Sequence, residues 1–286
     1  MKIGLVGTGL MGQPMALKLL QAGLSVTAYN RTDSKLEPLK DAGVKIADSV
    51  ANLLRESECL ILMLSDAPAI EETLLAADTL PLLKGRTVIQ MGTIAPSQSQ
   101  AISDRIIEAQ GAYLEAPVLG SIPQVKTGEL IVMVGSTQEQ FKQWLPILQH
   151  YSPQPIYTGA VGTASAMKLA LNQLIAGLTA TFALSLGFVQ RQGVDVEQFM
   201  EVVRQSALYA PTFDKKLQRM CDRNFANPNF PTKHLLKDTQ LFLDQAQELG
   251  LTTDSLEGIK NIIHQAISLK EGDGDYSAIY NAINPQ

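Results

Sequence analysis

The chain opens on a pattern of apolar and polar positions that predicts a strand, a tight turn and a helix. Residues 2–6 form a short apolar run, and glycines at 7, 9 and 12 then give the spacing GxGxxG. The next segment, QPMALKLLQAG, carries apolar residues at helical spacing and ends at Gly23. The stretch LSVTAYNRT then returns to strand character. Residues 1–32 therefore predict a βαβ unit.

The same opening also resembles a secretion signal, because one basic residue precedes an apolar run. A signal needs an uninterrupted apolar stretch of roughly 7 to 15 residues, whereas the glycines and Thr8 interrupt this one after a few residues. No uninterrupted run reaches the roughly 18 apolar residues of a membrane span. Cys59 and Cys221 are the two cysteines and lie far apart. We therefore expect a protein of the reducing cytoplasm.

Further apolar runs of strand length follow, namely ECLILMLSD, RTVIQMGT and LIVMVGS, separated by helical or loop segments. They predict a mostly parallel sheet with crossover helices. Residues 163–193 are small and apolar nearly all the way round, which predicts a long buried helix, and no strand pattern returns after it. We expect an α/β protein: a doubly wound Rossmann domain over 1–162 and an all-α domain over 163–286, joined by that long helix.

Composition and charge narrow the possible partners. With 45% hydrophobic and 18% charged residues and a net charge of −5, the chain reads as a soluble globular protein. A net negative charge argues against nucleic acid and anionic membrane as partners, because both require a basic surface. No cysteine or histidine spacing fits a metal site. The acidic segment KEGDGDYSA lacks the full ligand set of a calcium loop, so we interpret it as a helix end and a turn.

In a βαβ unit each glycine of the loop has a role. Gly7 permits the tight turn, Gly9 lets the backbone approach a pyrophosphate, and Gly12 lets the helix pack closely on the strand. Leu10 and Met11 complete the loop, and the helix N-terminus offers N–H groups to phosphate. The alternative is a glycine turn without a ligand. The position of the glycine loop between a predicted strand and a predicted helix favours a dinucleotide site over this alternative.

The end of the second predicted strand bears on the choice of coenzyme. NAD sites usually place an acidic residue there, but the chain reads Asn30, Arg31, Thr32 and has no acid until Asp33. Arg31 can bind a 2′-phosphate through paired N–H groups, and its two neighbours offer hydrogen bonds. We therefore expect NADP(H). The competing interpretation makes Arg31 a solvated loop residue and Asp33 a helix cap.

Two further positions carry candidate chemistry. Leu64, Ser65, Asp66 and Thr93 lie at the ends of predicted strands, where such sheets bind ligands, although a strand-end cap is the simpler explanation for each of the three polar residues. Lys168 falls inside the long apolar helix, where an unpaired ammonium is costly, and Asn172 lies one turn further on the same face. The two could form a proton-transfer pair. Equally, Lys168 could extend to solvent while Asn172 caps a neighbouring backbone.

Four segments in order, GLVGTGLMGQPMALKL, APVLGS, VGTASAMKLALNQ and FPTKHLLKDTQL, resemble the signature regions of the β-hydroxyacid dehydrogenases. The resemblance is strongest to NADPH-dependent glyoxylate and succinic semialdehyde reductases; 3-hydroxyisobutyrate and tartronate semialdehyde enzymes are the alternative. It implies reduction of a small carboxylated aldehyde in a cleft between the domains, and a homodimer or homotetramer. A related imine reductase would typically carry Asp or Tyr at the position of Lys168, and a non-catalytic binding module would lose this lysine.

The resemblance also implies residue roles. Lys168 matches the catalytic general acid, and Asn172 the amide that positions it or the substrate. Thr93 and Lys237 match residues near the cofactor. The implied substrate contacts are Val118, Leu119, Gly120, Ser121, Phe230 and Asp238. Two positions depart from the family pattern: Leu119 replaces a serine that helps bind the carboxylate, with a hydroxyl only at Ser121, and Ala164 replaces a glycine before the lysine.

Overall fold

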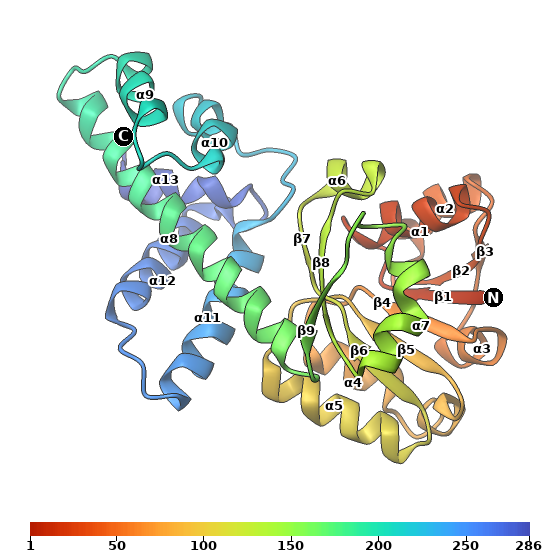
Figure 1. Cartoon of the computed structure of the whole chain (residues 1–286). Helices are drawn as coiled ribbons and strands as arrows, with labels where there is room; N and C mark the ends of the chain where they lie inside the picture. The colour runs from red at the N-terminus through yellow and green to blue at the C-terminus, as the bar shows by residue number, and fades with distance from the viewer. The chain divides into compact units, whose positions relative to one another are not determined.

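The computed structural model describes all 286 residues, which form two compact units, Met1–Lys168 and Leu169–Gln286 (Figure 1). The division falls inside one long helix, α8 (Thr163–Arg191). The first unit is a sheet covered by helices, and the second is made of helices. The predicted α/β class, with a Rossmann sheet followed by helices and a long connecting helix, is confirmed.

The sheet of the first unit contains nine strands in the order β3-β2-β1-β4-β5-β6-β8-β7, with β9 paired to β8. The pairs from β3 to β6 are parallel, and β8 runs antiparallel to β6 and β7. The sequence predicted five of the nine strands. Of the other four, β3 and β7 are two residues long and β9 is largely exposed, so they carry no apolar run. The fourth, β6, is buried, but its short segment AYLE ends in an acidic residue. The strands are β1 (Lys2–Val6), β2 (Ser25–Tyr29), β3 (Lys45–Ile46), β4 (Cys59–Leu62), β5 (Thr87–Gln90), β6 (Ala112–Glu115), β7 (Val118–Leu119), β8 (Ile131–Gly135) and β9 (Ile156–Gly159).

Successive residues of the strands point to opposite faces of the sheet, and each face has its own core. Ile3 and Leu5 share one core with α1, α6 and α7, whereas Val6 and Leu60 share the other with α3, α4 and α5. Both faces are buried, which explains why the strands read as continuous apolar runs. The helices are α1 (Gly12–Gln21), α2 (Glu37–Asp41), α3 (Val50–Glu56), α4 (Ala67–Leu74), α5 (Pro96–Glu108), α6 (Ile122–Thr127) and α7 (Gln138–Leu148).

The strand order reverses direction between β1 and β4. From β1 the chain moves outward to β2 and β3, and from β4 it moves the other way to β5 and β6. In open parallel sheets, ligands bind outside the carboxyl ends of the strands at such a switch point. The glycine loop after β1 and the segment after β4 therefore flank the expected binding position.

The second unit contains only helices and turns beyond one isolated bridge. After α8 come α9 (Val196–Gln205), α10 (Pro211–Cys221), α11 (Thr232–Glu248), α12 (Asp254–Ala266) and α13 (Ile279–Ile283). Two apolar cores hold them together, and α8 contributes to both: Ala176 and Ala180 to one, Phe182 and Leu186 to the other.

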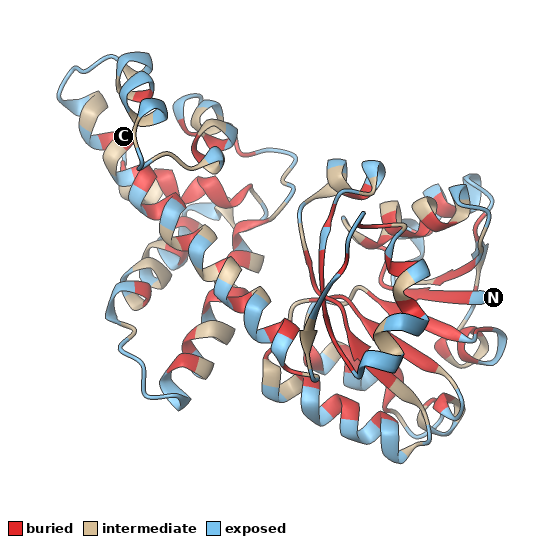
Figure 2. Cartoon of the chain, viewed as in Figure 1, coloured by how far each residue is buried: buried red, intermediate tan, exposed pale blue.

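The prediction that α8 is buried on all sides is wrong. Leu174, Leu184 and Phe188 expose 54%, 63% and 64% of their surface, and Figure 2 shows exposed residues recurring along the helix. Ala176, Ala180, Phe182 and Leu186 face the two cores of the second unit, whereas Leu174, Leu184 and Phe188 do not belong to them. By length and composition α8 would also suit a membrane, with mean hydropathy 1.5 over one 18-residue window, but core helices of soluble proteins meet that criterion too.

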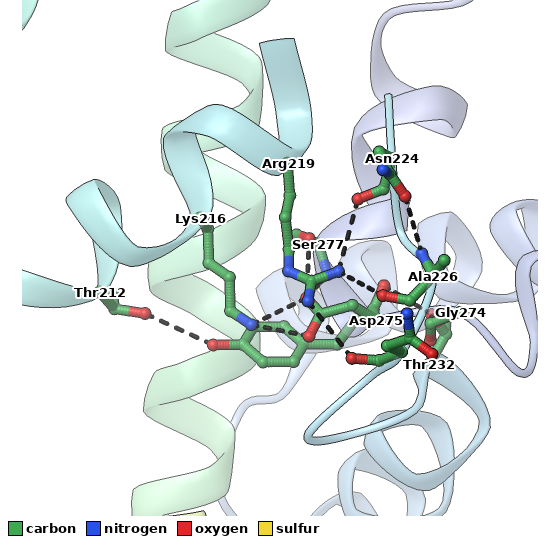
Figure 3. Close-up of polar contacts among 11 residues, drawn as sticks. Thr212, Lys216, Arg219, Asn224, Ala226, Thr232, Gly274, Asp275 and Ser277 are labelled. Carbon is green, nitrogen blue, oxygen red and sulfur yellow. Dashed lines mark hydrogen bonds and ion pairs between the residues drawn. The ribbon is translucent and has the colours of Figure 1, made fainter. Parts of the chain in front are cut away.

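A buried ion pair holds the C-terminal turn of the second unit (Figure 3). Lys216 Nζ lies 2.8 Å from both carboxylate oxygens of Asp275, which is fully buried. The same carboxylate accepts hydrogen bonds from the amide and hydroxyl of Ser277. Burial lowers the pKa of Lys216, and the hydrogen bonds from it to Asp275 oppose that shift. The acidic segment near the C-terminus is thus a helix end and a turn, as the sequence predicted.

Candidate active site

The glycine loop has the geometry that a dinucleotide phosphate requires. Gly7 adopts a φ of +92°, and its N–H donates to the carbonyl of Tyr29 at 3.0 Å. A Cβ on Gly12 would overlap the carbonyl oxygen of Gly7, whereas a Cβ on Gly9 would meet no atom within 4 Å. No side chain caps α1 at its N-cap residue, Met11. The loop is therefore tight beneath Gly12 and open beside Gly9, which fits a pyrophosphate held at the start of α1.

Asn30 shapes this loop. The N–H of Thr8 donates to Asn30 Oδ1 at 3.1 Å, and Asn30 Nδ2 donates to the carbonyl of Thr32 at 3.1 Å. Its amide therefore ties the loop to the end of β2, a role that the sequence did not indicate. Arg31 and Thr32 are exposed beside it, in a position where a guanidinium can meet an incoming anion.

The segments after β4 and β5 lie at the same edge of the sheet. Asp66 caps α4 by accepting from the N–H of Ala69 at 2.9 Å, and Ser65 Oγ donates to Asp66 at 2.8 Å. The strand-end cap is thus confirmed for Asp66, with Ser65 bonded to it. Leu64 and Thr93 are half-buried in the two segments. Both are therefore placed at the ligand-binding edge that the strand order defines.

The segment predicted to bind the substrate carboxylate joins β7 to α6. Leu119 pairs with Ile131 of β8, and Gly120 adopts a φ of +134°, which favours glycine. Ser121 precedes α6, and its N–H and hydroxyl both donate to Gln124 Oε1, at 3.0 and 2.8 Å. Two donors thus converge on one oxygen atom. The bond from the Ser121 N–H is the one that the glutamine of a capping box accepts. The hydroxyl that was expected to replace the family serine is also directed at Gln124.

Lys168 and Asn172 lie one turn apart on α8, and a buried carboxylate from α11 fixes the second of them. Asn172 is 3% exposed, and its Nδ2 donates to Asp238 Oδ2 at 2.6 Å. Lys237 Nζ lies 2.9 Å from the other oxygen of Asp238, which is itself 2% exposed. Lys168 is half-buried. A buried carboxylate needs such partners, so here Asp238 orients Asn172 and Lys237, a role different from the substrate contact expected for it.

Phe230 lies just before α11 within an aromatic cluster. Its ring stacks on His234 with 6.5 Å between centroids and meets the edge of Tyr276 at 5.7 Å. The ammonium of Lys216 lies 4.1 Å from the centre of the Tyr276 ring. The ion pair of Figure 3 therefore supports the aromatic residue predicted to cover the substrate.

Two residues that hold these segments in place, Glu115 and Lys216, belong to no sequence motif and were not predicted. Glu115 is fully buried at the end of β6 and accepts hydrogen bonds from the start of α8. Lys216 supports the cluster around Phe230. The readable signal for Glu115 was a lone acid inside the apolar run AYLEAPV, since a buried charge requires partners. No group of three or more His, Cys, Asp or Glu side chains is arranged to hold a metal ion.

Two family models cover the chain. Residues 2–159 match the NAD binding domain of 6-phosphogluconate dehydrogenase, and residues 162–283 match the NAD-binding region of NADP-dependent 3-hydroxyisobutyrate dehydrogenase. Together they span both units and indicate a nicotinamide coenzyme.

Known proteins are similar over nearly the full length. Glyoxylate/succinic semialdehyde reductase 2, chloroplastic, of Arabidopsis thaliana is 30% identical over 98% of this chain and 79% of its own length. Reductase 1 of the same plant is 28% identical over 99% and 98%. The crystal structure of 3-hydroxyisobutyrate dehydrogenase from Salmonella typhimurium shares the fold, with a TM-score of 0.86 and 24% identity over 98% of this chain and 99% of that one.

Proposed function

The chain belongs to the β-hydroxyacid dehydrogenase family, and on that premise we propose that it reduces glyoxylate or succinic semialdehyde with NADPH. As a member of this family it is an oxidoreductase that acts on CH–OH groups with NAD(P). The observation that carries the proposal is the polar set on α8 and α11: Lys168, one turn before Asn172, which the buried Asp238 holds. The names of the two plant relatives support the substrate class.

In the proposed reaction Lys168 is the proton donor. The bound coenzyme supplies a hydride to the carbonyl carbon. Lysine side chains are cationic at neutral pH, so Lys168 can donate a hydrogen bond to the carbonyl oxygen and then transfer the proton to it. Asp238 keeps the Asn172 amide in one orientation one turn away, which limits the positions open to the substrate. Oxidation of the hydroxyacid would require Lys168 to start neutral.

The substrate carboxylate would bind at the start of α6. Ser121 already directs its N–H and hydroxyl at one oxygen, Oε1 of Gln124. We propose that a carboxylate oxygen of the substrate replaces Gln124 as the acceptor of these two bonds, since hydrogen bonds to an ionised acceptor are about twice as strong. This contact would compensate for the serine that Leu119 replaces.

A panel of short aldehydes tests the proposal. The full-length protein is mixed with NADPH and each of glyoxylate, succinic semialdehyde, methylmalonate semialdehyde and a cyclic imine, and the absorbance of NADPH is followed. We expect turnover of the carboxylated aldehydes and a much lower kcat/KM for the imine. Turnover of the imine alone, or of no compound, would contradict the proposal.

The same panel tests the coenzyme. We propose that Arg31 binds the 2′-phosphate, because it is exposed at the end of β2 where no acid opposes it. One charge-assisted hydrogen bond is worth about 1.5–3 kcal/mol, so kcat/KM should favour NADPH over NADH by roughly ten- to a hundredfold. Arg31→Ala should abolish most of this preference and leave the NADH rate unchanged. An equal preference before and after the substitution would argue against Arg31.

We further propose that a second copy of the chain covers the exposed apolar side of α8, giving a homodimer or homotetramer. Leu174, Leu184 and Phe188 are each more than half exposed on this side, and contiguous apolar surface of this kind marks interfaces. Light scattering should give a mass of at least two chains, and Leu184→Glu with Phe188→Glu should reduce it. A wild-type mass of one chain at micromolar concentration would rule the interface out.

A further inference from the structure

One buried carboxylate receives hydrogen bonds from five donors, four of which lie at the start of α8 and one on α5. Glu115 Oε1 accepts from the backbone N–H groups of Gly162, Ala164 and Ser165, at 2.8, 2.8 and 3.1 Å. Its Oε2 accepts from the hydroxyls of Ser165 at 2.6 Å and Ser99 at 2.5 Å. The side chain is fully buried, so these donors take the place of water at both oxygens.

This carboxylate serves as the N-terminal cap of α8. The first N–H groups of a helix have no partner inside it, and the side chain of the preceding residue usually accepts from the second and third of them. Gly162 precedes α8 and has no side chain to offer. Glu115, about fifty residues earlier in the chain, accepts from those N–H groups instead, and its negative charge suits the positive end of the helix dipole.

The residues packed around the Glu115 carboxylate restrict it to one position. A Cβ on Gly135 would overlap Glu115 Oε1, and Gly162 itself adopts a φ of +103° that turns its N–H toward the carboxylate. Ser99 Oγ is also 2.8 Å from the Tyr113 hydroxyl. Movement of the Glu115 side chain would therefore break its bonds to α5 and to the first turn of α8 together.

We propose that Glu115 is a positioning residue for Lys168. Ser165 precedes Lys168 by three residues, or about 4.5 Å along the helix axis, and its N–H and hydroxyl are both bonded to Glu115. In the other direction, Glu115 leads within three residues into Val118, where the proposed carboxylate-binding segment begins. The side chain of Glu115 thus holds the turn before the lysine, while its backbone lies three residues before that segment. The inference rests on the proposed function.

The test replaces Glu115 with glutamine, which keeps the shape but places an N–H₂ against groups that also donate. Because a misplacement of about 1 Å can cost roughly 10²-fold in rate, kcat should fall by up to about 10²-fold. The KM for NADPH and its dissociation constant from fluorescence titration should stay within about twofold, since no group proposed to bind coenzyme is changed. Amide hydrogen exchange should accelerate at Ala164 and Ser165.

Two smaller variants serve as controls and remain informative if Glu115→Gln folds poorly. Ser165→Ala removes a hydroxyl bond on α8, and Ser99→Ala removes the matching bond on α5. Positioning predicts a larger fall in kcat for Ser165→Ala than for Ser99→Ala. A purely structural role predicts equal falls in thermal stability and no change in kcat for either.

A double variant isolates the route of the effect. If Glu115 acts through Lys168, adding Glu115→Gln to the Lys168→Ala variant should not lower kcat further. A wild-type kcat for Glu115→Gln, or a further tenfold loss in that background, would overturn the inference. If the wild-type protein reduces no aldehyde, the proposed function fails instead, and the exchange rates of Ala164 and Ser165 still decide whether Glu115 holds the helix.

Discussion

Replacing Lys168 with alanine is expected to lower kcat for aldehyde reduction by roughly 10²- to 10⁴-fold, the range that general acid catalysis contributes. The substitution removes the proposed proton donor and changes neither the bond from Asn172 to Asp238 nor the ion pair of Lys237 with Asp238. NADPH binding should persist, because the glycine loop is unchanged. Initial rates with the best aldehyde of the panel, together with a fluorescence titration of NADPH, measure both quantities.

The matched control is Lys142→Ala, which removes the same charge from an exposed position on α7. It should retain wild-type rates. Lys168→Arg keeps the positive charge but cannot release a proton readily, so it should recover little of the lost activity. A Lys168→Ala enzyme that turns over aldehydes at the wild-type rate would refute the assignment of the proton donor.

Replacing Gly12 with alanine should impair both folding and coenzyme binding. The added Cβ would overlap the backbone oxygen of Gly7, far inside the 3.0 Å that real Cβ atoms keep. Gly7 cannot yield easily, because its N–H is bonded to Tyr29 and its φ is +92°. Overpacking of this kind costs about 1–3 kcal/mol, and displacement of the loop should weaken NADPH binding by at least about tenfold. Thermal unfolding and fluorescence titration measure the two effects.

Alanine substitutions at two other glycines distinguish the steric effect of an added Cβ from the loss of a contact with the coenzyme. Gly258 lies within α12, and a Cβ added there would meet no atom within 4 Å, so Gly258→Ala should leave stability equal or higher and binding unchanged. Gly9 is equally open in the protein alone, so Gly9→Ala should fold normally yet bind NADPH more weakly. Normal NADPH affinity in both Gly9→Ala and Gly12→Ala would exclude the loop as the phosphate site.

The local features of the candidate site were readable before the fold was known. The glycine spacing between an apolar run and a helical pattern indicated the loop, and Lys168 stood out as a charge in an apolar helix. The S-x-x-Q spacing of Ser121 and Gln124 is also local and typical of a capping box, although the Ser121 hydroxyl was predicted to bind the substrate carboxylate. Each of these signals depends on residues fewer than a dozen positions apart.

The roles of Glu115, Asp238 and Asn30 were not readable in the same way. Glu115 accepts from residues 47 to 50 positions away, and Asp238 from Asn172, 66 positions away. Asn30 bonds Thr8 across 22 positions. A polar residue in an apolar segment indicates that a hydrogen-bond partner is needed. Which residue that partner is depends on how the strands and helices are arranged in space.

By itself, the amino-acid order established the alternation of strands and helices in the first part of the chain, the glycine loop and a long helix over 163–193, which the structure ends at Arg191. These features are readable because period and spacing are local properties of the backbone. The assembled fold decided three other features: the pairing of β8 with β6, the exposed side of α8, and the hydrogen bonds from the turn before Lys168 to Glu115. Long-range packing and hydrogen bonds decide those features, and no short segment of sequence contains both partners.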